Sequence, residues 1–110
     1  MVDDIRSFGS VQTWRDGFAE YWGDATVEDD AIDTLEQFCE MLRNDPDAII
    51  AECLRPRASG EELMMRTRAR RKYIEHIQAF ETEHESRKMG NSVRSFFIHN
   101  GVAMNPSIVR

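Results

Sequence analysis

Apolar residues recur at spacings of three and four along most of the chain, and five segments carry this pattern. Because an α-helix has about 3.6 residues per turn, such spacing gathers apolar side chains on one helical face. No segment alternates between apolar and polar residues for long enough to predict a strand. We therefore expect an all-α fold, a compact bundle of about five helices over residues 10–22, 27–43, 45–55, 59–84 and 90–101.

Helix-capping residues mark several of the expected boundaries. Ser10 is suited to cap the first helix, and Asp45 the third, with Pro46 in the first helical position where its missing N–H costs nothing. Pro56 should end the third helix. "SGEE" at residues 59–62 has the form of a capping box for the long fourth helix. Gly101 is placed to adopt the left-handed conformation that closes the fifth helix in a Schellman motif.

The apolar face of each predicted helix defines the expected core. We interpret the aromatic residues of 10–22 as core, with a binding platform as the alternative. The expected core residues are Val11, Trp14, Phe18, Tyr21 or Trp22, Ala31, Leu35, Phe38, Cys39, Leu42, Ile49, Ile50, Cys53, Leu54, Leu63, Tyr73, Ile74, Ile77, Phe80, Val93, Phe96 and Phe97.

Length and composition indicate a single globular domain. The chain has 110 residues, of which 41% are hydrophobic. No apolar run approaches a membrane span and no signal peptide is recognisable, so we expect a cytoplasmic protein that does not contact a membrane. Cys39 and Cys53 should be buried reduced thiols. We expect a flexible N-terminus over residues 1–9, the helical domain over 10–104 and the start of a linker over 105–110.

Charge is divided unevenly between the two halves of the chain. Residues 1–54 contain 14 acids and 3 bases, whereas residues 55–110 contain 6 acids and 11 bases. Such asymmetry points to a polyanionic partner for the basic half. On the second predicted helix the acids lie opposite the apolar face and should point away from any phosphate backbone. These acids are Asp29, Asp33, Glu36 and Glu40.

The basic half contains a dense run of cations, "RTRARRK" at residues 66–72. One interpretation is a solvated helix face, and the other is a phosphate-binding patch. Arg68, Arg71 and Lys72 should point outward, but Arg66 and Arg70 project on the same side as the core residues of this helix. Because a helix seldom buries two arginines without partners, either this end of the helix overhangs the core or the two arginines reach across its edge toward a ligand.

The sequence contains no convincing catalytic or metal-binding motif. His84 and Arg87 form an H-x-x-R pair, which arises easily by chance, and the default for His84 is a structural role. The glycines are scattered, and three histidines with two cysteines do not form a zinc spacing. We therefore expect no enzymatic activity in this chain, no cofactor, no metal and no small-molecule substrate.

Three stretches together resemble a known family. "LEQFCEMLRNDPDAIIAECL", a long helix ending "KYIEHIQAF", and "SVRSFFIHNGVAMN" resemble the N-terminal core-binding domain of tyrosine recombinases, the phage integrase family, with archaeal members the most similar. The resemblance covers about residues 10–105. It implies a SAM-like helical domain that clamps duplex DNA, while a separate C-terminal catalytic domain, which this chain lacks, performs strand exchange.

The resemblance also implies where DNA would be contacted. The family fold presents a helix end to the phosphate backbone, and the cation run occupies that position here. The first set of expected contacts is Arg66, Arg68, Arg70, Arg71 and Lys72, and the second set is Asn91, Arg94 and Ser95 on the last helix, which should face outward. Expected partners are double-stranded DNA and other recombinase protomers on it. The alternative is a small acidic helical module that binds a basic protein and no DNA.

Overall fold

A computed structural model describes residues 5–23, 26–56, 63–65, 67–102 and 104. Within these residues five α-helices form one bundle, so the predicted all-α fold is confirmed. The elements in chain order are the 3-10 helix η1 (Ile5–Ser7), α1 (Gly9–Tyr21), α2 (Asp29–Leu42), α3 (Pro46–Cys53), the strands β1 (Leu54–Pro56) and β2 (Leu63–Met65), α4 (Thr67–His84) and α5 (Arg87–His99).

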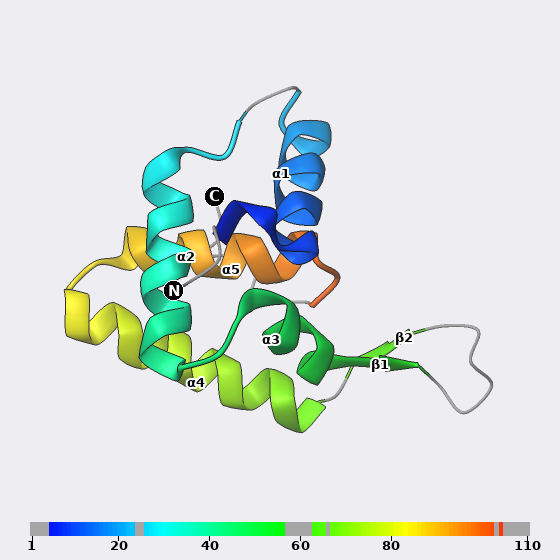
Figure 1. Ribbon diagram of the computed structural model, residues 1–110. Helices are drawn as coiled ribbons and strands as arrows, with labels where there is room; N and C mark the ends of the chain where they lie inside the picture. The colour runs from blue at the N-terminus through cyan, green and yellow to red at the C-terminus, as the bar shows by residue number, and fades with distance from the viewer. Residues whose placement is uncertain (1–4, 24–25, 57–62, 66, 103, 105–110) are drawn as a thin grey trace.

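Helix α5 occupies the centre of the bundle. It packs against α1, α2 and α4, which surround it in Figure 1. Val93, Phe96 and Phe97 of α5 are completely buried. The Phe97 ring lies 6.4 Å from that of Phe38 on α2, and the Phe96 ring lies 5.6 Å from that of Trp14 on α1, both edge to face. Edge-to-face aromatic contacts therefore join α1 and α2 to α5.

Two predicted helix caps are present. The Asp45 carboxylate accepts a hydrogen bond from the Ala48 N–H at 2.7 Å, with Pro46 in the first position of α3. Gly101 has a φ of 92°. Its N–H donates to the Ile98 carbonyl at 3.0 Å, while the Val102 N–H donates to the Phe97 carbonyl at 2.9 Å. These two bonds are those of a Schellman motif, so the predicted end of α5 is confirmed.

The start of α1 differs from the prediction. Helix α1 begins at Gly9 after Phe8, and Ser10 is buried inside its first turn. The Ser10 N–H donates to Asp47 Oδ1 at 2.8 Å, so a carboxylate from α3 satisfies a free donor of this first turn. The prediction that Ser10 caps the helix was wrong, because the cap is supplied by a residue distant in sequence.

A short hairpin precedes α4 where a helix was predicted. Leu54–Pro56 pairs antiparallel with Leu63–Met65, and α4 begins only at Thr67. Pro56 disfavours helical backbone at the residue before it, so the chain leaves α3 after Cys53 and becomes extended. The backbone groups of the extended strand β1 then pair with those of β2. A two-stranded hairpin has two free edges, so the missing N–H of Pro56 is tolerated. The proposed capping box at residues 59–62 lies outside the described residues.

Most of the predicted core is confirmed, with one clear exception at the end of α1. Cys39 and Cys53 are buried and unpaired, and burial is the main cause that raises the pKa of Cys39 to about 12 and that of Cys53 to about 11. Tyr21 and Trp22, however, are 72% and 45% exposed. Both residues continue the apolar spacing of α1, but they lie at its end, where α5 no longer covers the helix. The apolar spacing therefore predicted more burial for these two side chains than the structure shows. Among the described helices none is long and apolar enough to cross a membrane.

Replacement of Gly101 by alanine should destabilise the fold. An added Cβ would meet Leu54 at an ordinary 3.7 Å, so the cost comes from the left-handed backbone, about 1–2 kcal/mol. Urea unfolding measures the loss. Gly9→Ala is the matched control, since an added Cβ there meets only Asp47 at 3.9 Å and the backbone is ordinary. Equal stability of the two variants would contradict the assigned role of Gly101.

Candidate nucleic-acid interface

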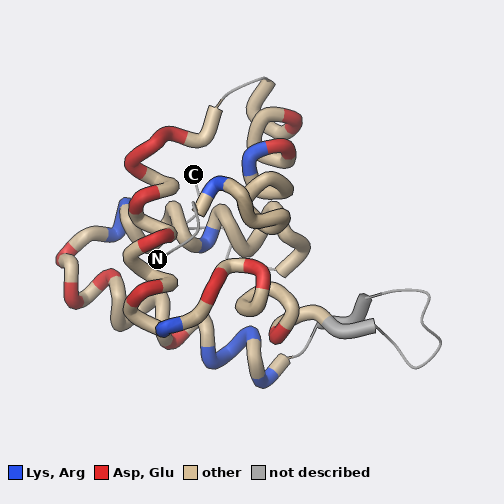
Figure 2. Tube along the Cα trace, viewed as in Figure 1, with Lys and Arg blue, Asp and Glu red and all other residues tan. Residues whose placement is uncertain are grey.

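The cation run lies on the first two turns of α4. Arg68, Arg71 and Lys72 are exposed, and Arg70 is half-buried. Figure 2 shows these positions as the blue stretch at the start of α4, next to the strands of the hairpin. Arg68 and Arg71 are three residues apart, so they share one face of the helix. Arg66 lies outside the described residues.

The distribution of charge along α4 works against the stability of the helix itself. Its first turn contains no acid, and its acids, Glu75, Glu81 and Glu83, all follow the cation run. The N-terminus of a helix carries a partial positive charge, so each cation placed there costs about 0.3–1 kcal/mol. An anion bound at this end would relieve that repulsion. Folding alone therefore does not explain the position of the run.

Lys72 differs from the exposed arginines because it has an acidic partner. Its ammonium group forms an ion pair with the Glu52 carboxylate of α3. The same carboxylate accepts a hydrogen bond from the Tyr73 hydroxyl at 2.5 Å. Burial, followed by this bond to Glu52, raises the pKa of Tyr73, which keeps the hydroxyl protonated as a donor. Glu52 thus neutralises one end of the cation run.

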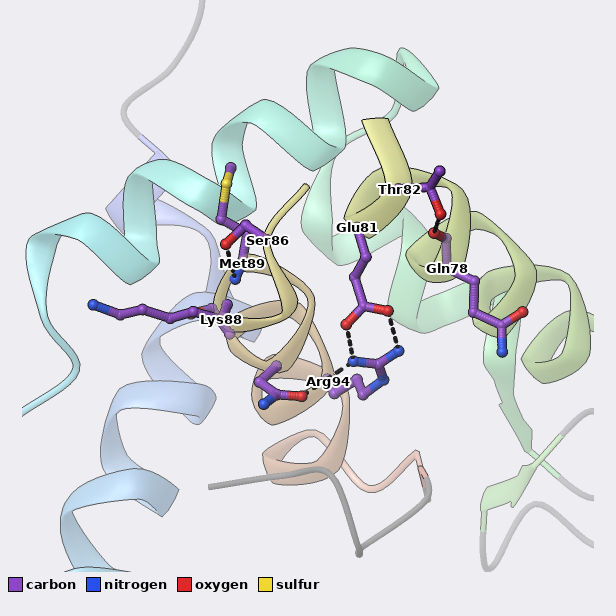
Figure 3. Close-up of polar contacts among 9 residues, drawn as sticks. Gln78, Glu81, Thr82, Ser86, Lys88, Met89 and Arg94 are labelled. Carbon is purple, nitrogen blue, oxygen red and sulfur yellow. Dashed lines mark hydrogen bonds and ion pairs between the residues drawn. The ribbon is translucent and has the colours of Figure 1, made fainter. Parts of the chain in front are cut away.

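The predicted contacts on α5 do not face outward. Arg94 is only 6% exposed, and its guanidinium binds the Glu81 carboxylate with two hydrogen bonds, of 2.6 and 2.9 Å (Figure 3). It also donates to the Asn91 amide oxygen at 3.1 Å, and Asn91 is half-buried. The hydroxyl of Ser95, which is 5% exposed, accepts a hydrogen bond from the Trp14 indole at 3.1 Å. The prediction that Arg94 and Ser95 face outward was wrong, because their polar groups bind residues of α4 and α1, whereas Asn91 keeps partial exposure.

Gly90 makes the Arg94–Glu81 pair possible. A Cβ at Gly90 would overlap the side chain of Glu81, including its carboxylate. A glycine is therefore required where the Glu81 side chain crosses α5. Neither Gly90 nor Glu81 was expected to contribute to this region. The prediction placed Gly90 at the first residue of the fifth helix, whereas α5 begins at Arg87 and contains Gly90 in its interior, where a glycine often marks a close approach of another group.

The two residues of the H-x-x-R pair lie where α4 ends and α5 begins. The His84 ring stacks edge to face on Phe80, with ring centroids 4.5 Å apart, and Arg87 is exposed at the start of α5. Within the described residues no cluster of three or more histidine, cysteine or acidic side chains could hold a metal ion. The arginines at the start of α4 are therefore the strongest candidate for a functional site.

Comparisons with known proteins found no matching family model, no matching curated protein and no matching solved structure.

Removal of Arg94 should destabilise the protein far more than removal of an arginine in the cation run. Arg94→Ala leaves Glu81, whose side chain is 19% exposed, without its partner, and loss of one member of a buried pair costs about 3 kcal/mol. Arg68→Ala should change stability by less than about 0.5 kcal/mol, because this side chain is exposed. Chemical denaturation measures both variants. Similar losses would mean that the ion pair contributes little.

Proposed function

We propose that this chain is a DNA-binding domain that holds the phosphate backbone of duplex DNA at the start of α4. The observation that carries the proposal is the position of the exposed Arg68 and Arg71 at the positive end of a helix whose first turn has no acid. Helix dipole and side-chain charge add at this point, and both favour an anion.

The residue types also suit phosphate. The guanidinium group is planar and forms two parallel hydrogen bonds to phosphate oxygens, which a lysine ammonium does not. Of the 14 cationic residues in the chain, 12 are arginine. Arg70 lies beside the outward pair and extends the positive surface toward the core. The acids of α2 lie on a separate helix, as the red positions in Figure 2 indicate, so DNA at α4 would avoid most of their repulsion.

The resemblance to tyrosine recombinases extends the proposal to a biological role. In that role the domain clamps DNA while a separate catalytic domain of the recombinase performs strand exchange, and neighbouring protomers bind the same DNA. The DNA-contacting set is then Arg68, Arg70 and Arg71, with Arg66 and Lys72 as further expected members, of which Lys72 is held by Glu52 in the free protein. Arg94 and Ser95 no longer belong to it, because their polar groups are engaged inside the bundle.

Binding to duplex DNA should depend steeply on salt concentration. Each phosphate neutralised contributes about −0.9 to the slope of log affinity against log salt, so three to five contacts predict about −3 to −4.5. Arg68→Ala together with Arg71→Ala should flatten the slope by up to about 1.8. Fluorescence anisotropy with a labelled duplex, started at low salt, measures the slope.

The matched control removes two exposed cations outside the run. Arg87→Ala with Lys88→Ala causes the same change in net charge at the start of α5. This control should keep the wild-type slope. If both double variants flatten the slope equally, the protein binds DNA through its general charge, and α4 is not the interface. If wild-type protein does not bind at all, the acidic interaction module becomes the better hypothesis.

Glu52→Gln should strengthen DNA binding. The glutamine amide oxygen still accepts from the Tyr73 hydroxyl, but the charge that holds Lys72 is gone. Lys72 then becomes available to a phosphate, and the salt slope should become steeper by up to about 0.9. Asp33→Asn, on the exposed face of α2, is the control with the same change in net charge. An equal gain in both variants would show that net charge, and not the release of Lys72, is responsible.

A further inference from the structure

The C-terminal end of α1 presents large aromatic side chains to solvent. Tyr21 is 72% exposed and Trp22 is 45% exposed, and their rings lie 4.9 Å apart, edge to face. Solvent-exposed aromatic residues that lie together are a common mark of a binding surface, since tyrosine and tryptophan dominate the energetics of many interfaces. Figure 1 shows this end of α1 at the top of the view, with α4 at the bottom. The exposed rings therefore belong to a different part of the molecule from the cation run.

A half-buried layer supports these two rings. The Phe18 ring lies 6.2 Å from Trp22, and the His99 ring of α5 lies 6.2 Å from Tyr21. Gly17 lets His99 approach α1 closely, because a Cβ there would come within 3.0 Å of His99 Nδ1. We call Phe18, Tyr21, Trp22 and His99 the aromatic patch. Its rings rest on two packed helices, so little ordering would be needed on binding.

Asn100, the residue after His99 of the aromatic patch, joins the end of α5 to the first turn of α1. Its side-chain amide donates to the Ser10 carbonyl of α1 at 3.0 Å and to the Phe96 carbonyl of α5 at 2.9 Å. One side chain thus ties the C-terminal end of α5 to α1. The aromatic patch is consequently part of the stable bundle and not of a loosely attached helix end.

The charge around the aromatic patch selects its partner. Helix α1 carries two acids and one base, the half-buried Arg15. Asp16 and Glu20 are exposed on α1 itself. Burial lowers the pKa of His99, so this ring is uncharged at neutral pH. A phosphate backbone would be repelled here, whereas a cation would be attracted both by the carboxylates and by the electron-rich faces of the rings.

We propose that the aromatic patch is a docking site for an arginine-containing segment of a partner protein, with a guanidinium group stacked on Tyr21 or Trp22 and paired with Glu20, the residue next to Tyr21. Arginine suits both parts of this surface, since its guanidinium stacks on aromatic faces and binds carboxylates. This surface is separate from the proposed DNA interface, so each of the two proposals can fail without the other.

A nona-arginine peptide is a suitable probe, with nona-citrulline as the uncharged control of the same shape. The two tryptophan indole N–H signals of the protein provide an internal comparison in two-dimensional NMR. Titration with nona-arginine should shift the Trp22 signal and leave that of Trp14, which is 1% exposed, unchanged. At about 0.3 M salt, where charges more than about 6 Å apart are screened, the shift should persist. Nona-citrulline should produce no shift.

Variants then separate the aromatic patch from the general acidity of the chain. Tyr21→Ser with Trp22→Ser should weaken nona-arginine binding about 5- to 30-fold, as expected for two lost cation–π contacts. Met41→Ser removes another exposed apolar side chain, on α2, and should bind as the wild type does. Asp16→Asn with Glu20→Gln should weaken binding as well.

Three outcomes would overturn the proposal. In the first, nona-arginine leaves the Trp22 signal unshifted. In the second, the Tyr21/Trp22 double variant binds the peptide as tightly as the wild type, which would assign binding to the acidic face of α2. In the third, sedimentation shows that the protein self-associates through these residues, with the double variant monomeric. The aromatic patch would then be an interface between copies of this chain.

Discussion

Burial of the middle of α5 on every side is the constraint on which the rest of the structure depends. Residues 93–97 are buried without interruption, and two of them, Arg94 and Ser95, are polar. Buried polar groups need partners, so α4 must supply Glu81 and α1 must supply Trp14. A hydrogen bond requires a defined distance and angle between its partners, which an apolar contact does not. These bonds fix how far along α5 each outer helix lies, and so they determine where the start of α4 and the end of α1 reach the surface.

The features predicted correctly from the sequence are those decided within a turn or two of chain. The cap of α3 by Asp45 and the close of α5 at Gly101 depend on backbone preferences of single residues. The apolar faces of α2 and α4 depend only on helical spacing, which is why Leu35, Phe38, Ile77 and Phe80 are buried as predicted. The outward position of Arg68 and Arg71 follows from the same spacing.

The features missed are those decided by contacts distant in sequence. Arg94 and Ser95 were predicted to lie on a polar outer face, because nothing local reveals that α1 and α4 cover the middle of α5. Tyr21 and Trp22 continue the apolar spacing of α1 but extend past the core, so the pattern could not distinguish a buried end from an exposed one. Leu63–Met65 became a strand because β1 offered a partner, which no property of those three residues alone predicts.

The ends of α2 and α4 carry a further consequence. Arg43 and Glu85 occupy left-handed positions with φ of 54° and 51°, in hydrogen-bond patterns like the one that Gly101 completes. A side chain in this conformation is strained by about 1–2 kcal/mol, whereas glycine is not. The outer helices α2 and α4 therefore end in turns whose residues, Arg43 and Glu85, are strained in the left-handed conformation. The central helix α5 ends in the same kind of turn with a glycine, which adopts this conformation without strain. The two strained turns are the natural positions at which evolution or engineering could strengthen the domain without altering its exposed arginines or aromatic rings.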